Sequence, residues 1–113
     1  MIRIDAMWLA AEPTDMRAGA DRLLARVVQV FGAAQAHHGY LFANARGTRI
    51  KLLVHDGFGV WCAARRLNTG HFNWTTPGAG RPTALELTRA QFEALVLGLP
   101  WQRLPEMQSI TRA

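Results

Sequence analysis

The sequence predicts an α+β fold: an antiparallel sheet of four to five strands with two helices packed mainly on one face. Two runs of strand-forming residues, 50–55 and 60–67, are joined by the turn sequence Asp56-Gly57-Phe58-Gly59, which is typical of a β-hairpin. Two other segments, 20–31 and 88–99, carry apolar residues at helical spacing. Strand runs and helical segments that follow one another in this way indicate the α+β class.

Length and composition fit one soluble domain. With 113 residues the chain can bury about two thirds of its unfolded surface, and we assign residues 1–105 to a single domain. Residues 106–113 show no apolar periodicity and are expected to form a frayed tail. The apolar runs are too short to span a membrane and the amino terminus lacks the pattern of a signal peptide. We therefore expect a cytoplasmic protein without membrane association, in agreement with its single cysteine, Cys62.

The hairpin is expected to form the centre of the sheet, with a third strand at residues 71–74 completing a meander. Pairing His55 with Val60 fixes the register, and cross-strand partners share a side of the sheet. The side expected in the core carries Ile50, Leu52, Val54, Trp61, Ala63, Arg65 and Leu67. The other side, which is half apolar and basic, carries Arg49, Lys51, Leu53, His55, Val60, Cys62, Ala64 and Arg66.

Two more strands are expected before the hairpin. Residues 40–45 form an apolar run that the turn sequence at 46–48 connects to 50–55, so the two strands should be antiparallel. Residues 7–10 form a shorter apolar run that we assign to a fifth strand. It ends before Pro13, which cannot donate to a sheet ladder.

The first helix is expected to follow a polar segment in which Thr14 or Asp15 caps the first turn. Gly32 is a natural stop at its carboxyl end. One stripe of the helix is apolar and should face the sheet: Ala20, Leu23, Leu24, Val27, Val30 and Phe31.

The second helix carries a capping box, because Gln91 follows Thr88 by three residues. Leu87 and Phe92 flank this start and can pack on each other as a hydrophobic staple. Gly98 ends the helix. The apolar face is expected to consist of Phe92, Leu95, Val96 and Leu99.

The charge balance favours a polyanionic partner. The net charge is +5 and the sequence pI is about 11, which is typical of proteins that contact nucleic acid. The candidate nucleic-acid-binding residues lie in the hairpin, with Arg46 beside them: Arg49, Lys51, Arg65 and Arg66. The open alternative is that these arginines only solvate an exposed face of the sheet.

No residue is assigned to catalysis, metal binding or cofactor binding. Asp56 is the only acid in the hairpin and is expected to cap its own turn. The histidines lack cysteines at zinc-ligand spacing, and no phosphate-binding glycine pattern is present. We therefore expect a protein that is not an enzyme. An enzyme would require Asp56, His55 and His71 to converge on a pocket or an ion.

Residues scattered along the chain form a pattern that is fairly specific in combination: Thr14, Asp15, Met16, Arg17, Gly19, Asp21, Ile50, Lys51, Asp56, Gly57, Gly59, Arg65, Arg66, Leu67, Gly70, Phe72 and Trp74. This pattern resembles the short TnpB-type accessory protein, the product of the second open reading frame, in insertion sequences of the "insertion sequence 66" class. The resemblance covers about residues 3–104. One departure is Ala18, where the family typically has lysine. The resemblance implies a role in transposition beside a separate transposase that carries the catalytic acids.

Two functions follow from these observations. The favoured one is a non-catalytic accessory protein in DNA transposition that contacts DNA through the basic face of the sheet. The alternative is an adaptor that docks on the transposase without touching DNA, through the apolar residues Leu53 and Val60 or the loop at residues 75–83. The expected partners are therefore DNA, the transposase and other proteins of the same element.

Overall fold

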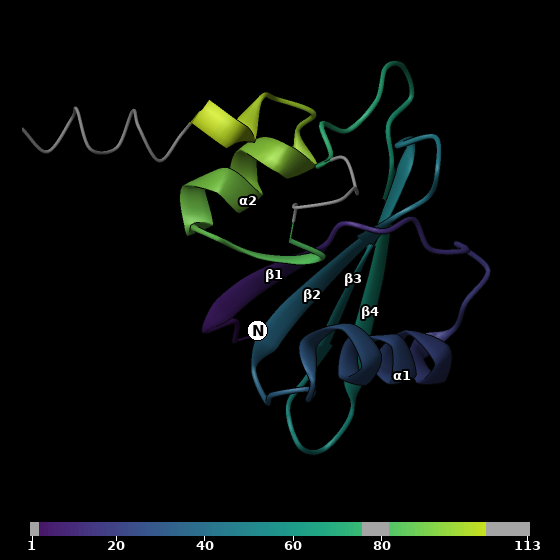
Figure 1. Cartoon of the computed structure of the whole chain (residues 1–113), viewed down its shortest axis with the longest axis vertical. Coiled ribbons are helices and arrows are strands. Elements are labelled where there is room, and N and C mark those ends of the chain that lie inside the picture. The colour runs from purple at the N-terminus through teal and green to yellow at the C-terminus, as the bar shows by residue number, and fades with distance from the viewer. Residues whose placement is uncertain (1–2, 76–81, 104–113) are drawn as a thin grey trace, which may run out of the picture.

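The computed structural model describes residues 3–75 and 82–103, which form a five-stranded sheet and two α-helices (Figure 1). The predicted α+β class is confirmed. None of the helices in these two stretches is long and apolar enough to cross a membrane. The elements in chain order are β1 (Ala6–Ala10), α1 (Ala20–Phe31), β2 (His38–Ala43), β3 (Arg49–His55), β4 (Val60–Arg66), β5 (Ala84–Leu87), α2 (Arg89–Val96) and the 3₁₀ helix η1 (Trp101–Arg103).

The strands lie in the order β4-β3-β2-β1-β5, and the sheet is mostly antiparallel, as predicted. The hairpin has the predicted register, in which His55 faces Val60 and Arg49 faces Arg66. One pair, β1 with β2, is parallel. Helix α1 connects these two strands and returns the chain to the end of the sheet where β1 began, so β2 runs in the same direction as β1.

One strand of the predicted meander, the third one at residues 71–74, does not form. Residues 71–74 are not a strand, and β5 pairs with β1 at the far edge of the sheet instead. The backbone N–H of Phe72 donates to the carbonyl of Gly47, and the Phe72 side chain is buried in the core. The chain after β4 therefore crosses the end of the β2–β3 hairpin, because the Phe72 side chain is buried there. No strand follows β4 in the sheet, so β4 is an edge strand.

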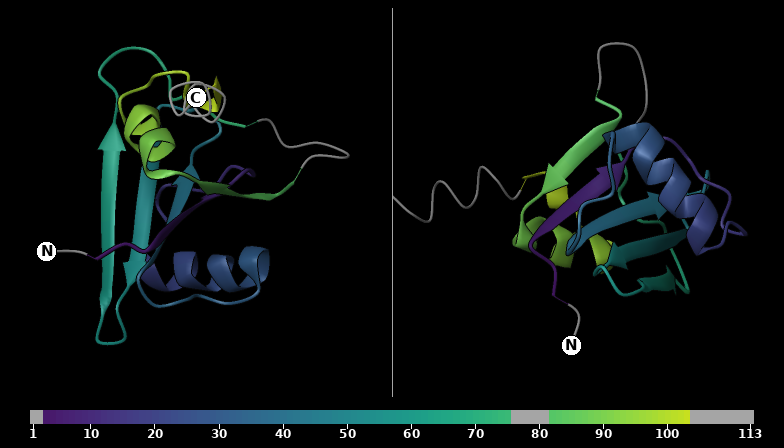
Figure 2. Two further views of the ribbon diagram at one scale, coloured as in Figure 1. Left: turned by 90° about the vertical axis from the view of Figure 1, so that its left-hand side faces the viewer. Right: turned by 90° about the horizontal axis from the view of Figure 1, so that it is seen from below.

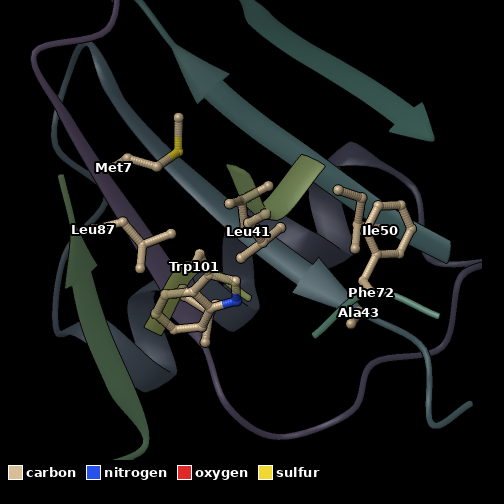
Figure 3. Close-up of a cluster of buried hydrophobic side chains, with 9 residues drawn as sticks. Met7, Leu41, Ala43, Ile50, Phe72, Leu87 and Trp101 are labelled. Atoms are coloured by element: carbon tan, nitrogen blue, oxygen red, sulfur yellow. The ribbon is translucent and has the colours of Figure 1, made fainter. Parts of the chain in front are cut away.

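The two helices lie on opposite sides of the sheet, so the expectation that both cover mainly one face is wrong (Figure 2). Their cores are separate. On the α1 side Leu23 and Val27 pack with Ala10, Ala18, Tyr40, Phe42 and Leu53. On the α2 side, part of which Figure 3 shows, Leu95 packs with Met7, Leu9, Leu41, Ala43, Ile50, Phe72, Leu87 and Trp101. The physical reason is β2, whose successive residues are buried on both faces and therefore need a cover on each.

The ends of the helices confirm two predictions and correct a third. Thr88 and Gln91 form the predicted capping box of α2, with Gln91 N–H donating to Thr88 Oγ1 at 3.1 Å. Gly32 ends α1 in the left-handed conformation, also as predicted. Neither Thr14 nor Asp15 caps α1, because the helix begins later, at Ala20, and its N-cap is Gly19, which has no side chain to cap with. The predicted tail at 106–113 and most of the 75–83 loop lie outside the described residues.

Candidate nucleic-acid interface

Arg49 and Arg66 are direct partners across β3 and β4, and both are exposed. Lys51 follows Arg49 by two residues on β3, so its side chain leaves the sheet on the same face. Like charges directly opposite each other in a sheet repel, which destabilises the pair in the absence of a counterion. The structure thus gathers three of the four candidate residues, Arg49, Lys51 and Arg66, on the α1 side of the hairpin.

Asn44 orders the turn that leads into this arginine pair. Its Oδ1 accepts hydrogen bonds from the backbone N–H of Thr48 at 2.9 Å and of Arg49 at 3.0 Å, and its Nδ2 donates to Thr48 Oγ1. Gly47 occupies the left-handed region with φ of 70°, which the tight turn requires. The turn places Arg46 beside Arg49. Sequence reasoning missed Asn44, although an asparagine three residues before the glycine of a turn, Gly47, is a usable signal.

Two adjoining hollows lie against this end of the hairpin, and we call them together the basic groove. The larger, of about 560 Å³, is lined by Pro13, Thr14, Asp15, Met16, Asn44, Ala45, Arg46, Thr48, Arg49 and Arg66. The smaller, of about 290 Å³, is lined by Met16, Arg49, Lys51, Ala64, Arg65 and Arg66. Residues 14–16, which belong to the family pattern in the sequence, therefore form one wall of the groove, and the basic hairpin forms the other.

Lys51 holds these two walls together. Its Nζ donates a hydrogen bond of 2.9 Å to the backbone carbonyl of Ala18, in the segment that precedes α1. The side chain is half-buried, and two of its three donors are left for other partners. Lys51 thus positions residues 14–19 against the sheet as well as adding positive charge to the groove.

Among the described residues that line the groove, Asp15 is the only acid, and Arg17 balances its charge. Arg17 donates from Nε and Nη2 to the Asp15 carboxylate at 3.2 and 3.1 Å. The hydrogen bonds from the Arg17 side chain, followed by that from its backbone N–H, lower the pKa of Asp15, so the carboxylate is ionised at neutral pH. Within residues 3–75 and 82–103 no ion pair involves the arginines that line the groove, Arg46, Arg49 and Arg66.

Arg65, the fourth candidate residue, extends from the opposite face of β4. Its Nε donates a hydrogen bond of 2.7 Å to the carbonyl of Val96, the last residue of α2. A basic side chain at this position satisfies a carbonyl that the helix leaves without an internal partner. Arg65 therefore links β4 to α2, and its side chain is separated by the sheet from those of Arg49 and Arg66.

The residues that an enzyme would need do not converge. Asp56 Oδ1 accepts hydrogen bonds of 2.9 Å from the N–H groups of Phe58 and Gly59, so it caps its own turn, as predicted. His55 Nε2 is hydrogen-bonded to the carbonyl of Ala34 at 2.8 Å. His71 lies near Gly47, at the other end of β3. Within the described part of the chain, no group of three or more histidine, cysteine, aspartate or glutamate side chains is placed to hold a metal ion.

The other residues of the family pattern serve the fold. Gly57 and Gly70 have φ of 89° and 81°, in the left-handed region that favours glycine. Gly59 donates to Asp56 in the hairpin turn. Phe72 is buried in the core, and Trp74 Nε1 donates to the carbonyl of Ala10 at 3.0 Å.

The apolar residues proposed for an adaptor are in different environments. Leu53 is buried, at 1% exposure, because it packs beneath α1, so the expectation that it is available to a partner is wrong. Val60 is 42% exposed on the edge strand β4. Only Val60 is therefore available on the surface.

Residues 5–106 match the family described as IS66 Orf2-like proteins. The chain belongs to this family. Two relatives from Sinorhizobium fredii are the uncharacterized proteins y4hO and y4jC, each 30% identical to this chain. The first alignment covers 88% of this chain and 85% of y4hO, and the second covers 85% of this chain and 80% of y4jC. No solved structure matches the chain. Membership of the IS66 Orf2-like family indicates an accessory role in transposition, in association with the IS66 transposase machinery.

Proposed function

We propose that this IS66 Orf2-like protein is a non-catalytic accessory factor that binds the sugar-phosphate backbone of DNA in the basic groove. Arg46, Arg49 and Arg66 are the principal phosphate ligands, and Lys51 adds a fourth positive charge. The observation that carries the proposal is the Arg49–Arg66 pair: the two exposed residues are cross-strand partners, and neither forms an ion pair with an acid in the described parts of the chain.

A phosphate group would relieve the repulsion within this pair. Guanidinium groups donate bidentate hydrogen bonds to phosphate oxygens, and a single anion can accept from both arginines. The turn held by Asn44 and the segment held by Lys51 define the two walls before any ligand arrives. Little conformational freedom of the backbone would therefore be lost on binding.

Arg65 is left out of the proposed contact, although the sequence placed it among the candidates. Its Nε is already hydrogen-bonded to Val96, and its side chain lies on the other face of the sheet. Backbone contacts of this kind carry no information on base sequence, so the proposed groove binds DNA through its charge and shape.

The test is equilibrium binding of the wild-type protein to short duplex and single-stranded DNA at several salt concentrations. Four phosphate contacts predict a slope of log K against log salt of about −3.6 on duplex DNA. Absence of measurable binding at low salt would contradict the proposal. It would leave the adaptor function, in which the protein docks on the transposase without direct DNA contact.

A further inference from the structure

Among the described strands, β4 pairs with β3 alone, so its other edge carries no strand. It is the outermost strand of the sheet (Figure 2). All seven of its residues are exposed, including Trp61 at 50%. It contains no proline or glycine, and its pairing with β3 is unbroken from Arg49–Arg66 to His55–Val60. Edge strands of this length usually carry a device that prevents pairing with another strand. In β4 the charged residues stand only at one end, at Arg65 and Arg66, so the backbone edge from Val60 to Ala64 is open to another strand.

The hydrogen bonds at both ends of the hairpin show which backbone groups are free. The Asp56 N–H donates to the carbonyl of Gly59, and the Leu67 N–H donates to the carbonyl of Thr48. Bonded pairs alternate along an antiparallel ladder, so residues 61, 63 and 65 direct their N–H and C=O groups to β3. Four residues of β4 therefore direct theirs outward: Val60, Cys62, Ala64 and Arg66.

We propose that the partner of this edge is the β4 strand of a second copy of the chain, in antiparallel orientation. Outward-directed residues can bond only to outward-directed residues. One antiparallel register uses all four of them on both copies, with Cys62 opposite Ala64 and Val60 opposite Arg66. It supplies about eight backbone hydrogen bonds. The two-fold axis then passes between the two copies of Ala63.

The side chains select the same arrangement. In this register Trp61 faces Arg65 of the second copy, and a guanidinium group over an indole ring is a favourable cation–π contact. The Nε of Arg65 is bonded to Val96, which leaves the Nη groups free for the ring. In an in-register parallel pairing Arg65 and Arg66 would lie beside their own copies, and like charges would repel. The strand is apolar at one end and basic at the other, so it complements itself only when reversed.

The resulting dimer has one continuous sheet made from both copies. A two-fold axis perpendicular to the sheet keeps both basic grooves on the same side. The offset between Val60 and Arg66 separates the two arginine pairs by about 20 Å along the strand direction. The dimer goes beyond the proposed DNA contact and does not depend on it, because β4 pairs through its backbone edge.

The register is tested by Ala63→Cys in a Cys62→Ser background. The two copies of residue 63 face each other in a non-bonded pair with Cα atoms about 4.5 Å apart, within reach of a disulfide. The control is Val60→Cys in the same background, whose copies are separated by about 20 Å. Air oxidation followed by non-reducing electrophoresis should give a covalent dimer for Ala63→Cys alone. Equal crosslinking of both variants, or none, would overturn the register.

The dimer itself is tested by sedimentation of the uncrosslinked protein. The wild-type chain should sediment as a dimer of 12.6 kDa subunits. Ala64→Pro should be monomeric with an unchanged circular dichroism spectrum, because the N–H it removes points away from β3 and proline is tolerated there. A monomeric wild-type protein would overturn the dimer and leave the edge to a strand from another protein. A dimeric Ala64→Pro variant would overturn it as well, since the interface would lie elsewhere.

Discussion

Arg49 and Arg66 face each other across β3 and β4, at the end of the hairpin where the segment before α1 reaches the sheet. This relationship connects the family pattern at residues 14–16 with the basic residues of the hairpin. A pair of like charges destabilises the strand pair that carries it. An anion bound between them would remove that repulsion, so binding and stability should be coupled.

Asn44→Ala should weaken both the fold and DNA binding, although it removes no charge. The variant loses the side-chain hydrogen bonds to Thr48 and Arg49, a loss of about 1–3 kcal/mol. The turn would then hold Arg46 and Arg49 less firmly. Urea unfolding and DNA titration measure the two effects. Asn68→Ala, at an exposed turn residue after β4, is the matched control and should change neither.

Lys51→Met should destabilise the protein by about 1–2 kcal/mol, because methionine keeps the apolar stem but loses the bond to the Ala18 carbonyl. Amide exchange near Ala18 should become faster as residues 14–19 come away from the sheet. Arg22→Met, which removes an exposed charge from α1, is the control. Equal unfolding free energies for the two variants would show that Lys51 does not hold this segment.

Leu23→Ala tests whether α1 covers a core of its own. Leu23 is fully buried against β2 and β3, and its truncation should lower the free energy of unfolding by about 2–5 kcal/mol. Val28→Ala, on the outer side of the same helix at 50% exposure, should change it by no more than about 0.5 kcal/mol. Similar losses from both variants would contradict the position of α1 on the sheet.

Asp56→Ala should show a stability loss that depends on pH. Hydrogen bonds from the N–H groups of Phe58 and Gly59 lower the pKa of Asp56 in the folded state. A lowered folded-state pKa stabilises the protein above the pKa of the unfolded chain, about 4, and this stabilisation is lost as the pH falls through the folded value. The difference in unfolding free energy between wild type and variant should therefore be largest near pH 7 and shrink toward pH 2. A difference that stays constant would mean that the charge of Asp56 is irrelevant.

The hairpin could be predicted from the sequence because the residues that determine it are close together in the chain. The turn at residues 56–59 fixes which residues face each other, and the observed register follows from it. The capping box at Thr88 and the stop at Gly32 are local in the same sense. Each depends on contacts between residues a few positions apart.

The arrangement of the layers could not be predicted in this way, because it depends on long-range packing. The apolar run of β2 requires a cover on both faces, and the prediction placed both helices on one. Phe72 lies in a region with strand-like composition, yet it is buried over the end of the hairpin and β5 takes the remaining edge. Neither result follows from local periodicity.

For the candidate site, the alternation of side chains along the strands correctly predicted that Arg49, Lys51 and Arg66 share one face of the sheet and that Arg65 lies on the other. The contribution of residues 14–16 was visible only as a family resemblance, since nothing in their composition indicates that they lie against the hairpin. The bond from Lys51 to Ala18 joins residues far apart in the chain, and no sequence pattern predicts it.

The most direct test of DNA contact through the basic groove is the salt dependence of duplex binding by Arg49→Ala/Arg66→Ala. The control is Arg3→Ala/Arg89→Ala, which removes the same charge from outside the groove, where both arginines pair with acids. Loss of two phosphate contacts should make the slope of log K against log salt shallower by about 1.8 for the first variant and leave it unchanged for the control. Equal slopes for the two double variants would contradict the proposed groove.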